Sequence, residues 1–166
     1  MYLSRTRNTK AVAEIIQNKT GGRLVELELQ TPYPENYQAI VQQVARENES
    51  GFLPPLKTVI NNFDKYDIVF LGFPTWGMQL PPPMNSFLNI YAMRGKTVVP
   101  FNTNGGYGVG STFETVKTLS PGANVLNGYS TRGGLERDGQ LLTIADARRA
   151  EVEREVVAWL NTLKLQ

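Results

Sequence analysis

The sequence predicts an α/β protein: a single doubly wound parallel sheet with helices on both faces. Short apolar runs alternate along the chain with segments whose apolar residues recur at roughly helical spacing. The run at residues 66–74, YDIVFLGFP, is almost entirely apolar, which is typical of a parallel strand buried on both faces. The length of 166 residues suits one domain with a sizeable core. We therefore expect one domain over residues 1–166, with right-handed crossovers.

The first half of the chain supplies strands and helices in turn. Residues 1–3 indicate a strand remnant, and residues 9–19 carry apolar side chains on one helical face. Residues 23–29, RLVELEL, alternate apolar and charged side chains, as in a strand with one face in solvent. Residues 35–49 return to the helical spacing. The buried strand at residues 66–74 comes next.

The second half repeats this alternation. Residues 83–92 predict a short helix, and residues 96–101, KTVVPF, predict a strand. Residues 109–119 are expected to be helical, and residues 123–129, ANVLNGY, are the last strand candidate. The C-terminal helix is the clearest element, because one stripe collects its apolar side chains: Val152, Val156, Trp159, Leu160 and Leu163.

Two details conflict with regular strands. Pro100 lacks an N–H, so we expect it where its strand leaves the sheet and not in the middle of the ladder. The first strand has only residues 1–3, whereas strands average about five to six residues. We therefore expect the first strand to be truncated, with several residues missing before Met1.

The composition excludes several chemistries. The chain contains no cysteine, which rules out disulfides, thiolate metal sites and cysteine nucleophiles. It contains no histidine, which is the usual general base and the commonest metal ligand. We therefore predict no catalytic side chain and no metal site, and we expect any reaction to depend on a bound group.

Charge and hydropathy favour a cytoplasmic protein. The net charge of +2 is too small to indicate nucleic acid or an anionic membrane surface as a partner. No apolar run is long enough to cross a bilayer, and the N-terminus lacks the apolar region of a signal peptide. We expect a cytoplasmic location, no membrane insertion and no nucleic-acid partner.

A hydroxyl-rich loop follows the first strand segment. Residues 4–9, SRTRNT, place Ser4, Thr6, Asn8 and Thr9 at the start of a helix. Backbone N–H groups at a helix start bind anions, and the helix dipole favours negative charge there. Because an ordinary helix cap needs only one such residue, the excess of donors favours a phosphate site. A plain helix cap is the alternative.

Two further loops follow strands and should meet the first loop, because ligands bind beyond the carboxyl ends of parallel strands. Residues 74–83, PTWGMQLPPP, form a stiff loop in which Trp76 either presents its ring at the site or packs back onto the core. Residues 102–112, NTNGGYGVGST, contain four glycines that let the backbone approach a ligand closely. Together the loops indicate a ligand with one phosphate and one planar heterocycle.

The glycine run has two other interpretations, and neither fits. A Walker A loop would end in Gly-Lys-Ser or Gly-Lys-Thr, and this run contains no lysine. A dinucleotide fingerprint would follow the first strand and precede an acidic residue about 20 positions on. A second glycine-containing segment, STRGGLERDG at residues 130–139, indicates a surface connection, to which we assign no role.

These three loops resemble those of flavodoxins, and the resemblance covers essentially all 166 residues. It implies a five-stranded sheet in the order 2-1-3-4-5, with the first strand central, and FMN as the cofactor. It also implies the FMN contacts. The phosphate would be held by Ser4, Arg5, Thr6, Arg7, Asn8 and Thr9. The ring would be flanked by Pro74, Thr75, Trp76 and Gly77 on one side and by Asn102, Thr103, Gly105, Gly106 and Tyr107 on the other.

Two features depart from this family's pattern. Arg7 stands where such loops often have glycine, and a positive φ there would cost about 1–2 kcal/mol. We expect Arg7 to avoid that conformation and to place a cation near the phosphate. The net charge of +2 also differs from the strongly acidic charge usual in electron-carrying flavodoxins, which weakens docking on a basic reductase surface.

The resemblance implies a low-potential electron carrier, served by a reductase and an acceptor protein. The alternative is an NAD(P)H-dependent FMN quinone or nitro reductase, for which NAD(P)H and a quinone are the partners. A third hypothesis is a binding module that has lost its cofactor, suggested by Arg7 and the short first strand. Loss of a central strand would leave both of its neighbours unpaired.

Overall fold

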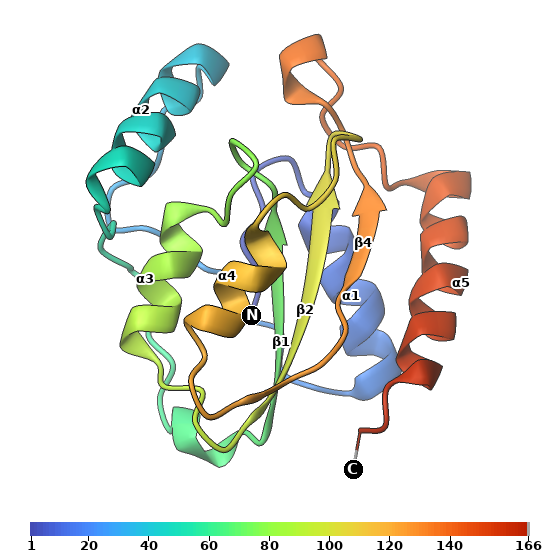
Figure 1. Cartoon of the computed structure of the whole chain (residues 1–166). Helices are drawn as coiled ribbons and strands as arrows, with labels where there is room; N and C mark the ends of the chain where they lie inside the picture. Colours follow the sequence, from blue (N-terminus) through green and yellow to red (C-terminus); the bar gives the residue numbers. More distant parts are fainter. Residues whose placement is uncertain (166) are drawn as a thin grey trace.

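The elements follow the predicted alternation of strands and helices (Figure 1), in a computed structural model that describes residues 1–165. The strands are β1 (Ile68–Pro74), β2 (Thr97–Asn104), β3 (Asn124–Val125) and β4 (Tyr129–Arg132). The α-helices are α1 (Asn8–Thr20), α2 (Tyr37–Ser50), α3 (Pro82–Ile90), α4 (Thr112–Thr118) and α5 (Asp146–Thr162). Two short 3-10 helices are η1 (Phe63–Lys65) and η2 (Glu136–Asp138). All strand pairs are parallel, which confirms the predicted fold class.

The first residues lie in the middle of the sheet although they form only bridges. Tyr2 pairs in parallel with Glu26 on one side and with Gly72 of β1 on the other. Backbone hydrogen bonds of 2.8–3.0 Å join these segments. The spatial order of segments across the sheet is therefore residues 25–27, residues 1–3, β1, β2, and then β3 and β4 side by side along β2. Residues 25–27 and β1, which flank residues 1–3, therefore both pair with Tyr2.

The predicted five-stranded sheet with a truncated first strand is met only in part, because the first two predicted strands are not regular. Residues 1–3 and 23–29 contribute isolated bridges, so the regular sheet has four strands within residues 1–165. Of the predicted strand at residues 123–129, only Asn124–Val125 form β3, which pairs with the start of β2. β4 pairs with the end of β2 and lies mostly in residues 130–139, which were predicted to be a surface connection. Between them Gly128 packs against the Phe113 ring so closely that a Cβ there would lie 2.6 Å from it.

Pro100 lies inside β2, contrary to the expectation that it would mark the end of the strand. Even-numbered residues of β2 direct their backbone groups away from β1. The carbonyl of Val98 accepts from Leu126 N at 2.9 Å, and that of Asn104 accepts from Gly133 N at 2.8 Å. Pro100 is also even-numbered, so its backbone nitrogen faces away from β1. It faces the gap between β3 and β4, where an N–H would have no strand to bond. The proline is tolerated because that side of β2 has no strand partner there.

Helices cover both faces of the sheet, as predicted (Figure 1). α1 and α5 pack on one face, where a buried cluster joins both helices to β2 and β4. α3 and α4 cover the other face, into which β1 directs Val69, Leu71 and Phe73. α2 stands beside α3 (Figure 1). Among residues 1–165, no helix combines the length and hydropathy needed to cross a bilayer.

Candidate functional site

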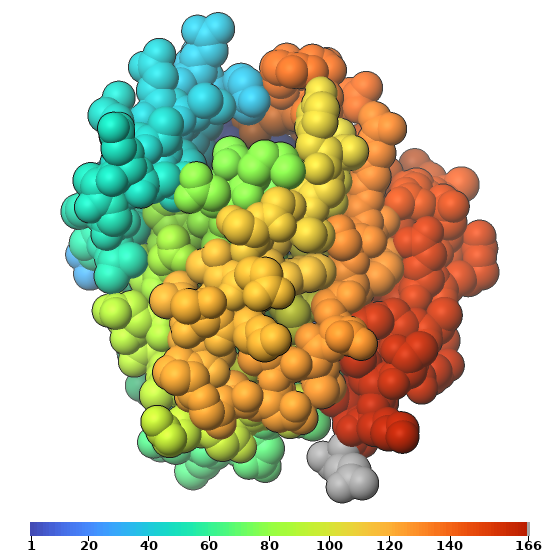
Figure 2. Space-filling model, in the orientation of Figure 1, coloured from blue at the N-terminus to red at the C-terminus, as the bar shows by residue number. Residues whose placement is uncertain are grey.

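The three predicted loops meet at one end of the sheet. They follow residues 1–3, β1 and β2, and together they line a cleft of about 490 Å³. α2 and residues 133–136 form further walls of this cleft. Figure 2 shows the hollow between α2 and residues 130–139, with N-terminal residues at its bottom.

The first loop presents a row of free backbone donors. Ser4 Oγ accepts a hydrogen bond from Lys10 N at 3.2 Å, which caps the start of α1. Within the described residues 1–165, the backbone N–H groups of residues 5–9 have no protein acceptor. Unpaired N–H groups at a helix start, reinforced by the helix dipole, form an anion site. This row is the structural feature that points to a phosphate.

Arg7 differs from the sequence-based expectation. Its backbone is left-handed, with φ 67° and ψ 3°, so the positive φ that we expected it to avoid is present. Its side chain is exposed and is not among the cleft-lining residues. The loop needs a left-handed residue at this position to turn into α1, and an arginine occupies it at a steric cost.

Replacing Arg7 by glycine is expected to raise the free energy of unfolding by about 0.5–1 kcal/mol. Glycine removes a left-handed penalty of about 1–2 kcal/mol, and its greater freedom in the unfolded chain offsets about 0.4–1 kcal/mol of that gain. Urea denaturation measures the difference. The control is Arg7→Ala, which keeps the penalty. A glycine variant no more stable than the alanine variant would contradict the prediction.

Asn8 and Thr9 are buried and hold the loop in place. Asn8 Nδ2 donates to the Leu141 carbonyl at 2.6 Å and to Thr6 Oγ1 at 2.9 Å. Asn8 Oδ1 accepts from two backbone N–H groups just before α5, at 2.9 and 3.1 Å. Thr9 Oγ1 lies 2.8 Å from Thr103 Oγ1. Both side chains line the cleft, but their polar atoms already have protein partners.

Arg5 joins three segments around the cleft. Its Nε lies 2.8 and 3.0 Å from the two carboxylate oxygens of Glu136 in η2. Its Nη atoms donate to the carbonyls of Pro34 and Glu35 at 3.1 and 2.7 Å. The side chains of this ion pair are only 20% and 21% exposed. Arg5 therefore braces the first loop against η2 and against residues 31–36, which we call the strap.

The second loop forms a tight turn beside the cleft. The backbones of Trp76 and Gln79 exchange hydrogen bonds of 3.2 and 3.0 Å. Gly77 and Met78 between them both have positive φ, 57° and 60°, as in a type I′ turn. The Met78 carbonyl accepts from Ser111 N at 3.0 Å. The turn is thereby docked on the third loop.

The predicted ring-flanking residues divide into two groups. The cleft is lined by Pro74, Thr75, Trp76, Gly77, Thr103 and Gly105. Asn102, Gly106 and Tyr107 are not among its lining residues. Asn102 is fully buried, and its Nδ2 donates to Thr75 Oγ1 at 2.9 Å, so it supports both loops from below. Tyr107 is 65% exposed.

The indole of Trp76 is half-buried, with one part at the cleft and another on the core. The ring of Tyr33, from the strap, meets it edge to face, with 5.6 Å between centroids and 81° between planes. Both sequence-based interpretations of this tryptophan therefore describe part of its surroundings. The ring is held from behind and still lines the cleft.

Sequence reasoning missed two walls of the cleft and Asn104 at its edge. α2, capped by Asn36, contributes Tyr37, Ile40, Val41, Val44, Ala45, Asn48 and Glu49. Residues 133–136, to which we had assigned no role, form the other wall. The available signal was the glycine pair, since a Cβ at Gly134 would lie 2.0 Å from the Leu141 carbonyl oxygen. Such a close approach of two backbone segments leaves room only for glycine.

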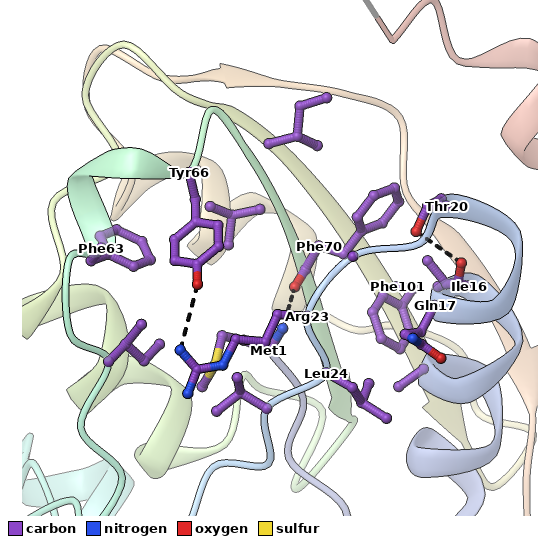
Figure 3. Close-up of a pocket in the computed structure, with 16 residues that line it drawn as sticks. Met1, Ile16, Gln17, Thr20, Arg23, Leu24, Phe63, Tyr66, Phe70 and Phe101 are labelled. Carbon is purple, nitrogen blue, oxygen red and sulfur yellow. Dashed lines mark hydrogen bonds between the residues drawn. The ribbon is translucent and has the colours of Figure 1, made fainter.

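A second hollow of about 180 Å³ lies near the amino end of β1 (Figure 3). Its walls are mainly apolar, with Phe63, Phe70 and Phe101 among them. Arg23 donates to the Tyr66 hydroxyl at 3.5 Å beside it. None of the predicted site residues line this hollow. The cleft above β1 and β2 is therefore the candidate site.

The sequence matches a family model described as Flavodoxin over residues 1–143. The chain belongs to the flavodoxin family. The family resemblance inferred from the three loops is confirmed. No curated protein matches this flavodoxin-family chain in sequence.

Solved structures share the fold of this flavodoxin-family chain. A candidate flavoprotein from Bacteroides eggerthii has a TM-score of 0.76 and 28% identity, covering 99% of this chain and 96% of that chain. A flavoprotein from Lactobacillus acidophilus in complex with FMN has a TM-score of 0.68 and 20% identity, covering 84% and 94%. Oxidised flavodoxin 2 from Bacillus cereus has a TM-score of 0.53 and 19% identity, covering 98% and 96%.

The cleft of this flavodoxin-family chain fits FMN in its donors and its walls. The N–H groups of residues 5–9 and the hydroxyl of Thr6 suit a phosphate dianion. Trp76 and the apolar side chains of α2 suit a planar ring system. The cleft thus offers both donors for a charged group and apolar side chains for a flat one.

Proposed function

We propose that this chain binds FMN in the cleft above β1 and β2 and acts as a low-potential electron carrier between a reductase and an acceptor protein. The observation that carries the proposal is the row of unpaired N–H groups at residues 5–9, beside the cleft that Trp76 lines. Family membership and the neighbour in complex with FMN support the cofactor. FMN supplies the electron-transfer chemistry when bound, which suits a chain without histidine or cysteine.

The first loop would hold the phosphate. Its N–H groups need no rearrangement to accept an anion, because Asn8 and Arg5 already fix the loop on both sides. Ser4 Oγ accepts from Lys10 N, which leaves its own proton free to be donated. Charge-assisted hydrogen bonds from a fixed loop would thus anchor one end of the cofactor.

The walls of the cleft would set the reduction potential. Trp76 and the side chains of Ile40, Val41 and Val44 provide an apolar surface around the ring position. A low-dielectric wall disfavours additional negative charge on a bound group. These apolar side chains would therefore disfavour extra negative charge on a flavin held in the cleft, and so would lower its reduction potential.

The turn at residues 76–79 offers a backbone group that can change direction. Within the described residues, the Gly77 carbonyl and the Met78 N–H have no protein partner. The Met78 carbonyl, in contrast, is held by Ser111. Glycine tolerates either orientation of the peptide that follows it. The 77–78 peptide would therefore be able to present either its carbonyl or its N–H to a ring bound beside Gly77, which lines the cleft.

FMN is expected to bind at least about 100-fold more tightly than riboflavin. Two charge-assisted hydrogen bonds to the phosphate contribute about 3 kcal/mol together, and about 1.4 kcal/mol corresponds to a tenfold change in affinity. Quenching of flavin fluorescence measures both dissociation constants. Equal affinity for the two flavins would refute phosphate binding by residues 5–9. A reductive titration of the FMN-bound protein then tests the carrier role, which requires a stable one-electron level.

The second candidate function is an NAD(P)H-dependent quinone or nitro reductase. The observation that favours it is the apolar face of α2, because Val41 is 47% exposed although it lines the cleft. Such a wall provides a surface for a flat, uncharged second substrate beside the ring. Steady-state oxidation of NAD(P)H by a quinone discriminates the two functions, because a carrier without its reductase shows almost none.

A further inference from the structure

Glu47 is a buried carboxylate that the proposed function does not use. It lies on α2 and is 7% exposed. Its Oε2 accepts from the Tyr33 hydroxyl at 2.5 Å, and its Oε1 accepts from Gln43 Nε2 at 2.9 Å. Among the described residues, no lysine or arginine forms an ion pair with it. A carboxylate buried without a cation is costly unless its hydrogen bonds are good, so its position requires an explanation.

Tyr33 connects Glu47 to the wall of the cleft. Its hydroxyl is held by Glu47, and burial together with this hydrogen bond raises the pKa of Tyr33 above its usual value. Its ring meets the indole of Trp76 edge to face at 5.6 Å. Tyr33 itself is not among the residues that line the cleft. Its influence on a ligand therefore passes through Trp76.

The strap that carries Tyr33 contains no helix or strand. Apart from Asn36, which caps α2, two side chains from other segments hold it. Arg5 binds the carbonyls of Pro34 and Glu35, and Glu47 binds the Tyr33 hydroxyl. Without the hydrogen bond to Glu47, the Tyr33 ring would gain conformational freedom, because residues 31–36 form no helix or strand that would restrain their backbone.

We propose that Glu47 and Tyr33 are positioning residues that hold the indole of Trp76 in the orientation in which it flanks a bound flavin ring. This inference rests on the proposed function, which places the flavin in the cleft. It adds that α2, through a buried carboxylate, determines how one ring wall is oriented. The chain of contacts runs from Gln43 to Glu47, Tyr33 and Trp76.

A double-mutant cycle tests this proposal. Tyr33→Phe is expected to weaken the binding of riboflavin and of FMN by the same factor, about tenfold. One buried hydrogen bond is lost, and the loop that would hold the phosphate is unchanged. In a Trp76→Ala background, Tyr33→Phe should change neither affinity further. The matched control is Tyr66→Phe, whose hydroxyl accepts a hydrogen bond from Arg23 at 3.5 Å and which lines the second hollow and not the cleft. Additive effects of Tyr33→Phe and Trp76→Ala would overturn the proposal.

Substitution of Glu47 provides a graded second test. Glu47→Gln keeps an acceptor for the tyrosine hydroxyl and should retain most of the riboflavin affinity, whereas Glu47→Ala should lose as much as Tyr33→Phe. Thermal unfolding of each variant is recorded beside the affinities. If both Glu47 variants lose affinity equally while remaining folded, the hydrogen bond to Tyr33 is not what positions the ring.

The flavin-free protein distinguishes failure of this proposal from failure of FMN binding. The chain has two tryptophans, so a Trp159→Phe background leaves Trp76 as the sole indole emitter. In that background Tyr33→Phe should lower the fluorescence anisotropy of Trp76, because its ring gains freedom. Unchanged anisotropy would overturn the positioning role even if flavin binds. Absence of flavin binding with lowered anisotropy would refute the proposed function alone.

Discussion

Asn8→Ala is expected to lower the free energy of unfolding by about 3 kcal/mol and to weaken FMN binding at least tenfold. The side chain is 3% exposed and serves two backbone N–H groups before α5 and the Leu141 carbonyl. Each buried polar group that loses its partner costs about 1–3 kcal/mol, reduced where water enters. Because these bonds also fix the first loop at the start of α1, its N–H groups would lose their common orientation. Urea denaturation and flavin titration measure the two effects.

Two further variants make this prediction specific. Asn18 lies on the exposed side of α1, so Asn18→Ala should change stability by less than about 0.5 kcal/mol. Asn8→Asp keeps the acceptor for both N–H groups but places a carboxylate next to the phosphate loop. We expect it to reduce FMN affinity more than riboflavin affinity. If Asn8→Ala unfolded at the same urea concentration as Asn18→Ala, Asn8 would not hold the loop.

Gly110→Ala is expected to destabilise the protein by about 2–5 kcal/mol and to weaken binding of riboflavin as much as FMN. Gly110 has φ 54°, and a Cβ there would lie 2.1 Å from the Met78 carbonyl oxygen. The substitution combines a left-handed penalty of about 1–2 kcal/mol with overpacking of about 1–3 kcal/mol. The clash pushes away the turn that carries Trp76, so the ring end of the ligand is affected and the phosphate end is not.

Gly108 provides the matched control for this glycine. Its φ is 87°, but a Cβ there would meet nothing within 4 Å. Gly108→Ala should therefore cost only the left-handed penalty of about 1–2 kcal/mol and leave flavin affinity nearly unchanged. Equal destabilisation by both alanines would show that contact with the turn is unimportant. A larger loss of FMN than of riboflavin affinity in Gly110→Ala would place its effect at the phosphate loop instead.

Helices and strands whose apolar residues are regularly spaced or continuous were predictable from the sequence alone. The helix at residues 9–19 and the buried strand at residues 66–74 are present with ends that differ by two residues or fewer. Their periodicity reflects burial of one helical face or of both strand faces, and a linear pattern records this directly. The three loops were found for a related reason, since hydroxyls, glycines and prolines mark them locally.

The partners of individual polar side chains could not be predicted from the chain. Arg5, Asn8 and Asn102 have the composition of ligand-binding residues, but in the fold they bond Glu136, residues 141–144 and Thr75. These partners lie 27 to 136 positions away in sequence. A side-chain donor binds whichever acceptor the topology brings near, and sequence spacing carries no record of that.

The sequence by itself determined the alternation of strands and helices, the hydroxyl-rich start of α1 and the position of an aromatic residue in the second loop. Each of these features can be read from residues that are close together in the chain. Only the tertiary structure decided that Arg7 is left-handed, that β2 contains Pro100 opposite a gap, and that α2 forms a wall of the cleft. Those features depend on which segments meet in space. Backbone strain and strand gaps are set by packing between distant segments, which local pattern does not encode.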